Sequence, residues 1–277
     1  MLTLSGANNE QHQEFFFSAR IFEISRALIY TEPTFLPTLE WTMSIEQCWA
    51  QSTNVRTPKE ALFDILPKFV DLGIHTLRFV THTQSMSQQA QDQVSTSLAQ
   101  EGLALQSFLL QWHLESTYWP SHDADGSVLD MEISIAYADY HTISVYLDGI
   151  FSYHATFTSV SAPISPILKR TEVDAKQILT TGQKLLTQGS AGVLLFFPLR
   201  VAGARARDAS TQFGILRLLR MITQRGFAVA QSFVEDLTAL RVRQQDNLEF
   251  AMHMADPRVV SLRDDRPGQI GIPRRHT

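Results

Sequence analysis

The sequence predicts an all-α fold, an irregular multi-helix domain of packed antiparallel helices. Apolar residues recur at steps of three and four along most of the chain, which is the spacing of one face of a helix. No strand–turn–strand series and no alternation of strands with helices is visible. With 277 residues, 44% of them hydrophobic, the chain can bury a sizeable core.

The first predicted helix covers residues 13–30 and ends before Pro33 and Pro37, because proline cannot continue a helix. Its apolar face is formed by Phe17, Ile21, Ile24 and Leu28.

A second helix is predicted to begin at Thr57. Thr57 can cap it, Pro58 suits the first helical position, and Glu60 completes a capping box. Its apolar run stops near Gly73, and Pro67 predicts a kink or an early end.

The middle of the chain contains the longest helical pattern. Before it, the Gln- and Ser-rich residues 84–100 fit either an exposed helix or a loose connection. A helix is expected over 103–118, and the composition of residues 121–127 is typical of a turn. The long pattern then predicts a buried helix on a face formed by Ile133, Tyr137, Tyr140, Ser144, Leu147, Phe151 and His154.

The clearest break is residues 159–166, SVSAPISP, where we expect a hinge or a subdomain junction. The sequence therefore divides into an N-terminal helical part (1–158), a C-terminal helical part (159–257) and a basic tail (258–277) that we expect to be poorly ordered.

Four helices are predicted after this break. Thr171 is expected to cap the first, which runs to about Gln188, and residues 189–192 separate it from an apolar helix over 193–204. Asp208 is expected to cap the third. The apolar faces of the last two are formed by Phe213, Leu216, Leu219 and Ile222, and by Ala230, Phe233, Leu237 and Leu240. The last helix is expected to end at residues 241–243, where cations suit the helix dipole.

Composition narrows the classes of function. Cys48 is the single cysteine, which excludes a disulfide framework and a thiolate metal cluster and fits a reducing compartment. No secretory signal and no apolar run long enough to span a bilayer is visible. Charge is uneven: no Lys or Arg occurs between Arg78 and Lys169, whereas 17 basic and 10 acidic residues follow from Lys169 onward. The positive charges of this part are scattered along the sequence, so they do not indicate nucleic-acid binding.

No catalytic or cofactor motif emerges. Phosphate-binding glycine loops, the H-E-x-x-H motif and the G-x-S-x-G elbow are absent, and the Gly189–Gly192 stretch has the spacing of a hinge. His122 with Asp123 and Asp125 matches no metal loop, and a solvated turn is the favoured reading. The Asp264–Asp265 pair is flanked by Arg263 and Arg266 in the tail, where it cannot shape a diphosphate pocket. Five histidines lie in the Lys- and Arg-free middle: His82, His113, His122, His141 and His154. His141 and His154 lie on the long helical pattern, where a core or rim histidine with a satisfied hydrogen bond is expected.

Three stretches resemble the regulatory region of fungal zinc-cluster transcription factors. FFFSARIFEISRALIYTEPTFL (15–36) looks like that family's helix followed by a turn, and ISIAYADYHTISVYLDGIFSYH (133–154) is similar to its long buried helix. The strongest resemblance is residues 194–240, where the block PLRVAGAR is followed by a helix, by RGF and by a closing amphipathic helix. The resemblance spans about residues 15–243 and implies an α-helical regulatory domain.

One departure from that family is important. Its DNA-reading module needs six cysteines that bind two zinc ions, and only Cys48 is present here. We therefore expect a nuclear transcription-regulatory domain, not an enzyme, that acts through protein partners or an effector and does not bind specific DNA by itself. Its partners would be transcriptional regulators or coactivators, including a full-length zinc-cluster protein. No catalytic, cofactor or metal residue is assigned. The alternatives are an all-α metal-dependent enzyme and a scaffolding domain without a transcriptional role.

Overall fold

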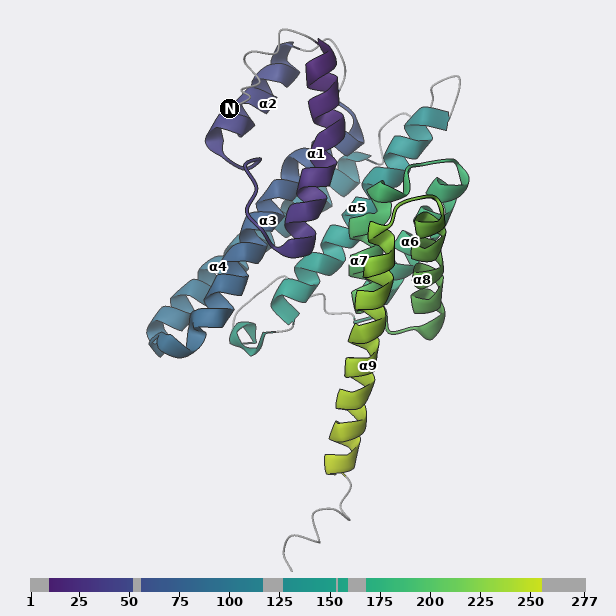
Figure 1. Cartoon of the computed structure of the whole chain (residues 1–277). Coiled ribbons are helices and arrows are strands. Elements are labelled where there is room, and N and C mark those ends of the chain that lie inside the picture. The colour runs from purple at the N-terminus through teal and green to yellow at the C-terminus, as the bar shows by residue number, and fades with distance from the viewer. Residues whose placement is uncertain (1–9, 52–55, 117–126, 153, 159–167, 256–277) are drawn as a thin grey trace, which may run out of the picture. The chain divides into compact units, whose positions relative to one another are not determined.

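The fold is built from helices alone in the part of the chain that the structure, a computed structural model, describes. These residues are 10–51, 56–116, 127–152, 154–158 and 168–255, and no strand occurs among them (Figure 1). The all-α prediction is therefore confirmed. The helices are α1 (Glu10–Tyr30), α2 (Leu39–Gln51), α3 (Pro58–His82), α4 (Gln88–Ser116), α5 (Ser127–Ser152), α6 (Leu168–Thr187), α7 (Phe196–Arg205), α8 (Ala209–Gln224) and α9 (Val229–Ala255).

The chain divides into two compact units, residues 1–233 and 234–277. Helices α1 to α8 and the start of α9 belong to the first unit, and the remainder of α9 belongs to the second. The hinge that the sequence predicts at 159–166 lies outside the described residues, as does the tail from residue 258. Helices α5 and α6, which precede and follow this segment, pack against each other.

Helix α1 confirms the first sequence prediction. Ile21, Ile24 and Leu28 are buried on one face, and the helix ends at Tyr30. Thr31 follows with a φ of 53°, in the left-handed region, so the chain turns sharply before Pro33. Helix α2, directly after this turn, was not predicted from the sequence.

Helix α3 begins as predicted but does not end as predicted. The Thr57 side chain accepts a hydrogen bond from the backbone nitrogen of Glu60 at 3.2 Å, which caps the helix. The helix then runs through Pro67 and Gly73 to His82, so the expected early end was wrong. Pro67 and Gly73 are both buried in the packed face, and burial of that face stabilises the helix beyond its local propensity.

Helix α4 resolves the alternative left open for the Gln- and Ser-rich segment. Residues 88–116 form one continuous helix, with a short 3₁₀ turn at Thr83–Ser85 connecting it to α3. Ser95, Leu98 and Ala99 are buried, so even the polar half of α4 packs on the protein. The predicted end at Tyr118 lies outside the described residues.

Helix α5 is the central element of the first unit. It packs on α6, α3 and α7, and it passes between α3 and the α6–α7 pair in Figure 1. Tyr140, Leu147 and Phe151 of the predicted face are buried. Ile143 and Val145, on other faces, are buried too, because neighbouring helices cover α5 from several sides. A helix that is apolar on several faces is expected in such a position.

The C-terminal helices follow the predicted order with corrected boundaries. Helix α6 begins at Leu168, so Thr171 lies inside it and is not its cap. The Asp208 carboxylate caps α8 as predicted, accepting from the backbone nitrogen of Thr211 at 3.0 Å. Phe213 is 64% exposed, which contradicts its predicted place on the buried face of α8. Helix α9 continues past Arg241 to Ala255.

Candidate ligand pocket

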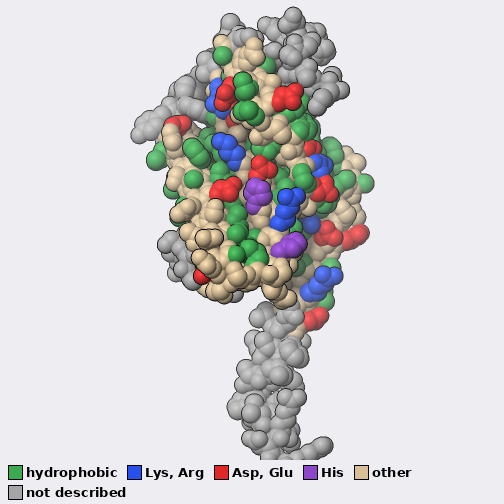
Figure 2. All heavy atoms as spheres, turned by 90° about the vertical axis from the view of Figure 1, so that its left-hand side faces the viewer, with side chains coloured by type: hydrophobic (Ala, Val, Ile, Leu, Met, Phe, Trp, Pro, Cys, Tyr) green, Lys and Arg blue, Asp and Glu red, His purple; other side chains and the backbone are tan. Residues whose placement is uncertain are grey.

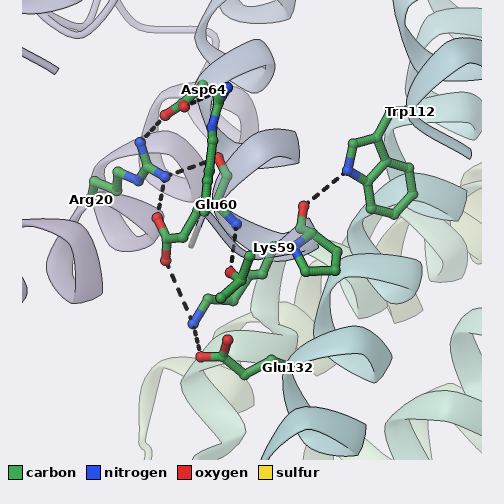
Figure 3. A network of polar contacts seen from close by, with 9 residues as sticks. Arg20, Lys59, Glu60, Asp64, Trp112 and Glu132 are labelled. Atoms are coloured by element: carbon green, nitrogen blue, oxygen red, sulfur yellow. Dashed lines mark hydrogen bonds and ion pairs between the residues drawn. The ribbon is translucent and has the colours of Figure 1, made fainter. Parts of the chain in front are cut away.

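A network of buried ion pairs joins α1 to α3. The Arg20 guanidinium donates to the carboxylates of Glu60 and Asp64, and also to the backbone oxygen of Glu60 at 3.0 Å (Figure 3). Arg20 is only 3% exposed, and the rings of Phe17 and Phe63 lie 5.0 and 5.8 Å from its guanidinium carbon. The guanidinium is thus held by charge and by aromatic faces in a fixed position.

The same network extends to α5. Lys59 pairs with Glu132, and the indole nitrogen of Trp112 on α4 donates to the backbone oxygen of Pro58 at 2.9 Å (Figure 3). Burial is the main reason that the pKa of the Glu60 carboxyl is raised; the positive charges of Arg20 and Lys59 oppose the rise, and the negative charge of Asp64 adds to it. The start of α3 is therefore connected to α1, α4 and α5 through polar contacts.

A pocket of about 490 Å³ lies beside this network, within the size range of small-molecule sites. Helices α1 to α4 and the turn after α1 line it, mostly with apolar side chains and six charged ones. The lining residues that carry the argument are Arg20, Trp49, Phe63, Asp64, Lys68 and Phe108. Since they come from four helices, the pocket exists only once the first unit has folded.

Helix α2 lines one side of the pocket and is held mainly by aromatic rings. Trp41 stacks on Phe16 with ring centroids 5.2 Å apart, and Trp49 lies 4.7 Å from Phe17. Phe35 adds a further contact to Trp41 at 4.8 Å. None of the extensive helix pairs in the described part of the chain includes α2. Helix α2 is consequently the least firmly packed wall of the pocket.

Two hydrogen-bond donors among the lining residues have no acceptor. The Nε of Arg20 and the indole nitrogen of Trp49 are both shielded from solvent, and neither makes a hydrogen bond among the described residues. Both groups can only donate. Buried polar groups are normally paired, so two unpaired donors on residues that line one pocket indicate where an acceptor would be stabilised.

The charges in the pocket are unequally compensated. The Asp64 carboxylate pairs with both Arg20 and Arg56. The Lys68 ammonium lies 5.4 Å from the centroid of the Phe108 ring and makes no ion pair in the described part of the chain. Burial raises the pKa of the Asp71 carboxyl, which favours its neutral form. The remaining acid, Glu46, is exposed.

A second polar cluster lies between α4, α5 and α6. The Nδ1 of His141 lies 2.8 Å from a carboxylate oxygen of Asp174, and the His113 ring stacks on Tyr140 at 4.8 Å. Burial and the nearby charges of His141 and Arg170 lower the pKa of His113. The adjoining cavity of about 70 Å³ is too small for a drug-sized ligand.

The remaining histidines and short motifs give no further site. The Nδ1 atom of His82 lies 2.8 Å from the carbonyl oxygen of Arg78, at the end of its own helix. His154 is half-buried, and burial lowers its pKa. Residues 122–125 and 263–266 lie outside the described residues. Within those that are described, no three His, Cys, Asp or Glu side chains come together as metal ligands. The Gly189–Gly192 stretch forms the turn after α6, with Gly189 at a φ of 88°.

Exposed apolar side chains do not define another site. On the face shown in Figure 2, hydrophobic side chains are interspersed with acidic, basic and histidine side chains. Phe108, Leu110 and Leu114 on α4 are examples of exposed large apolar residues. No helix among the described residues has the length and apolarity needed to cross a bilayer.

Comparison with protein-family models, with curated proteins and with solved structures finds no match to this chain. The pocket geometry is consequently the main evidence about function. Sequence reasoning assigned no site residue and missed this pocket. Its polar groups come from separate helices, and the only local signal was the pair Trp41 and Trp49 on a segment that carried no prediction.

Proposed function

We propose that the chain is a transcription-regulatory domain of the fungal zinc-cluster type, which responds to a small effector and acts through protein partners in the nucleus. In this proposal the chain is not an enzyme. It regulates transcription without sequence-specific DNA binding of its own, and a full-length zinc-cluster protein is the simplest partner.

The observation that carries the proposal is the pocket between α1, α2, α3 and α4. Its volume of about 490 Å³ and its apolar walls suit a small molecule. No nucleophile paired with a base lies in it, whereas the loosely packed α2 provides an element that a ligand can shift. A ligand that binds two positions of α2 unequally changes the surface offered to a partner. The sequence resemblance to the zinc-cluster regulatory region supports the same proposal.

A reporter assay tests this proposal. The chain is fused to an unrelated DNA-binding domain and expressed in a fungal host whose reporter promoter contains that domain's binding site. A several-fold change in reporter output relative to the DNA-binding domain alone is expected. Output equal to that of the DNA-binding domain alone, with the fusion present in the nucleus at the same level, would contradict a regulatory role.

A further inference from the structure

We propose that the pocket under α2 binds a small, mostly apolar molecule that carries a carboxylate. The indole N–H of Trp49 and the ammonium of Lys68 are its polar contacts. This inference names the chemical class of the effector and therefore rests on the proposed function for its biological meaning, although the binding itself can be measured independently.

The apolar part of the ligand follows from the walls. Leu36, Ile45 and Ile65 supply aliphatic surface, and Phe63 and Phe108 supply aromatic rings. Removing apolar surface from water is favourable in proportion to its area, so a ligand with an apolar body gains most in this pocket. A strongly polar ligand would leave these walls without favourable contacts.

The acceptor group follows from the unpaired donors. The indole nitrogen of Trp49 and the Nε of Arg20 have no acceptor. Among the described residues that line the pocket, no buried acceptor atom lacks a donor. An oxygen-bearing head group satisfies such donors, whereas an amine head group would add further donors. The asymmetry therefore favours a carbonyl or carboxylate oxygen.

The negative charge of the ligand follows from Lys68. Arg20 and Arg56 are neutralised by the carboxylates of Glu60 and Asp64, so Lys68 is the lining cation without an ion pair in the described part of the chain. A carboxylate is the natural partner of an ammonium beside an apolar surface. Glu46 and Lys68 are both exposed, so solvent screens the charge of each.

Entry of the ligand requires α2 to move. Neither unpaired nitrogen is accessible to solvent, so a ligand reaches them only when the side chains that cover them move. The helix is held chiefly by aromatic contacts at Trp41 and Trp49, which can reform after a small displacement. Ligand binding is thereby coupled to the position of α2.

Isothermal titration of the full chain with three compounds tests the proposal. The compounds are 4-phenylbutyrate, 4-phenylbutanol and 4-phenylbutylamine, which share one apolar body and differ in the head group. The carboxylate is expected to bind at least tenfold more tightly than the amine, with the alcohol between them. Equal or tighter binding of the amine, or no binding of any of the three compounds, would overturn the proposal.

Matched variants place the binding in this pocket. Trp49→Phe keeps an aromatic ring but removes the donor, and Lys68→Met keeps the apolar stem but removes the charge. Each is expected to weaken carboxylate binding about tenfold. Lys68→Met is expected to leave the affinity for the uncharged alcohol nearly unchanged, whereas Trp49→Phe is expected to weaken the alcohol as well, because its hydroxyl oxygen also accepts from the indole N–H. Lys176→Met on α6, whose side chain is 57% exposed, serves as the control and is expected to bind as the parent does. Unchanged carboxylate affinity in both pocket variants, with melting temperatures near that of the parent, would overturn the assignment. The reporter assay does not depend on these titrations, so failure of the ligand class and failure of the regulatory role are distinguishable.

Discussion

The phenol oxygen of Tyr146 on α5 lies over Gly73 on α3, in the space that a Cβ atom at position 73 would fill. Burial raises the pKa of Tyr146 to about 12, in keeping with a hydroxyl enclosed between helices. Gly73 is therefore required by a close approach of two helices and does not mark a helix end.

Replacement of Gly73 is expected to destabilise the protein through this contact. Gly73→Ala forces the Cβ against the Tyr146 hydroxyl, and such overpacking costs about 1–3 kcal/mol. In a Tyr146→Phe background the nearest atom is gone, so the same substitution should cost less. A double-mutant cycle by urea denaturation measures the difference. Equal costs in the two backgrounds would show that the contact is not the cause.

The Asp139 carboxyl predicts an unusual dependence of stability on pH. It is 1% exposed, neither oxygen has a hydrogen-bond partner among the described residues, and burial raises its pKa well above the ordinary value. Between the unfolded pKa of about 3.9 and the raised folded pKa, the unfolded state has lost the proton that the folded state keeps. Stability therefore falls as pH rises through this window.

Asp139→Asn removes that ionisation. Each unit by which the folded pKa is raised corresponds to about 1.4 kcal/mol, so the variant should melt at a higher temperature than the parent at pH 8. The advantage should shrink at pH 4.5. Thermal melts at both pH values measure this, with the exposed Asp92→Asn as control. A variant that melts below the parent at pH 8 would contradict the expectation.

The buried pair of Arg20 and Glu60 should be costly to break from one side. Arg20→Met leaves the Glu60 carboxylate buried without its guanidinium partner, and such losses cost about 3–5 kcal/mol. Arg26→Met breaks pairs whose arginine side chain is 39% exposed, so it should cost at most about 1 kcal/mol. Chemical denaturation measures the free energy of unfolding of both variants. A similar loss of this free energy in the two variants would show that burial of the network is unimportant.

Phe233 should contribute strongly to the core of the first unit. Its ring meets that of Phe196 edge-to-face with centroids 5.4 Å apart, and the Arg200 guanidinium carbon lies 5.3 Å from its centroid. Phe233→Ala is expected to cost about 3–5 kcal/mol. Phe213→Ala, at a 64% exposed ring, should change the melting temperature little. The prediction is wrong if both variants melt alike.

The chain alone is expected not to bind DNA with sequence specificity. Specific readout needs an element that places side chains at base edges. In the fungal zinc-cluster transcription factors, whose regulatory region this sequence resembles, the zinc cluster supplies that element. Scattered positive charge gives at most a salt-sensitive attraction to phosphates. Selection from a random-sequence library at about 150 mM salt tests this, and an enriched motif would contradict it.

Helical periodicity was sufficient to predict the fold class and the order of most helices. The caps at Thr57 and Asp208 were also correct, because capping depends on a few neighbouring residues. Local signals failed where tertiary packing decided the outcome. Pro67 and Gly73 read as helix breakers, yet α3 continues because its buried face packs on α1, α4 and α5.

The pocket could not be predicted from the sequence. Arg20, Trp49 and Phe108 are far apart along the chain, and no spacing rule relates them. Helix α2, with Trp41 and Trp49, lies in a segment for which no helix was predicted. The unpaired donors, which carry the ligand proposal, become visible only when the neighbours of each nitrogen are known.

The central position of α5 has a consequence for how the protein is made. Helices α1 to α4 leave the ribosome first, yet α3 and α4 pack on α5, which is synthesised later. The parts of their apolar faces that α5 covers stay exposed until residue 152 has emerged, and α6 and α7 can complete the core only after that. Transiently exposed apolar surface favours aggregation, so the nascent chain should need chaperone protection over this interval. A ribosome stall before α5 should leave a protease-sensitive chain, whereas a stall well beyond α8 should leave a resistant one.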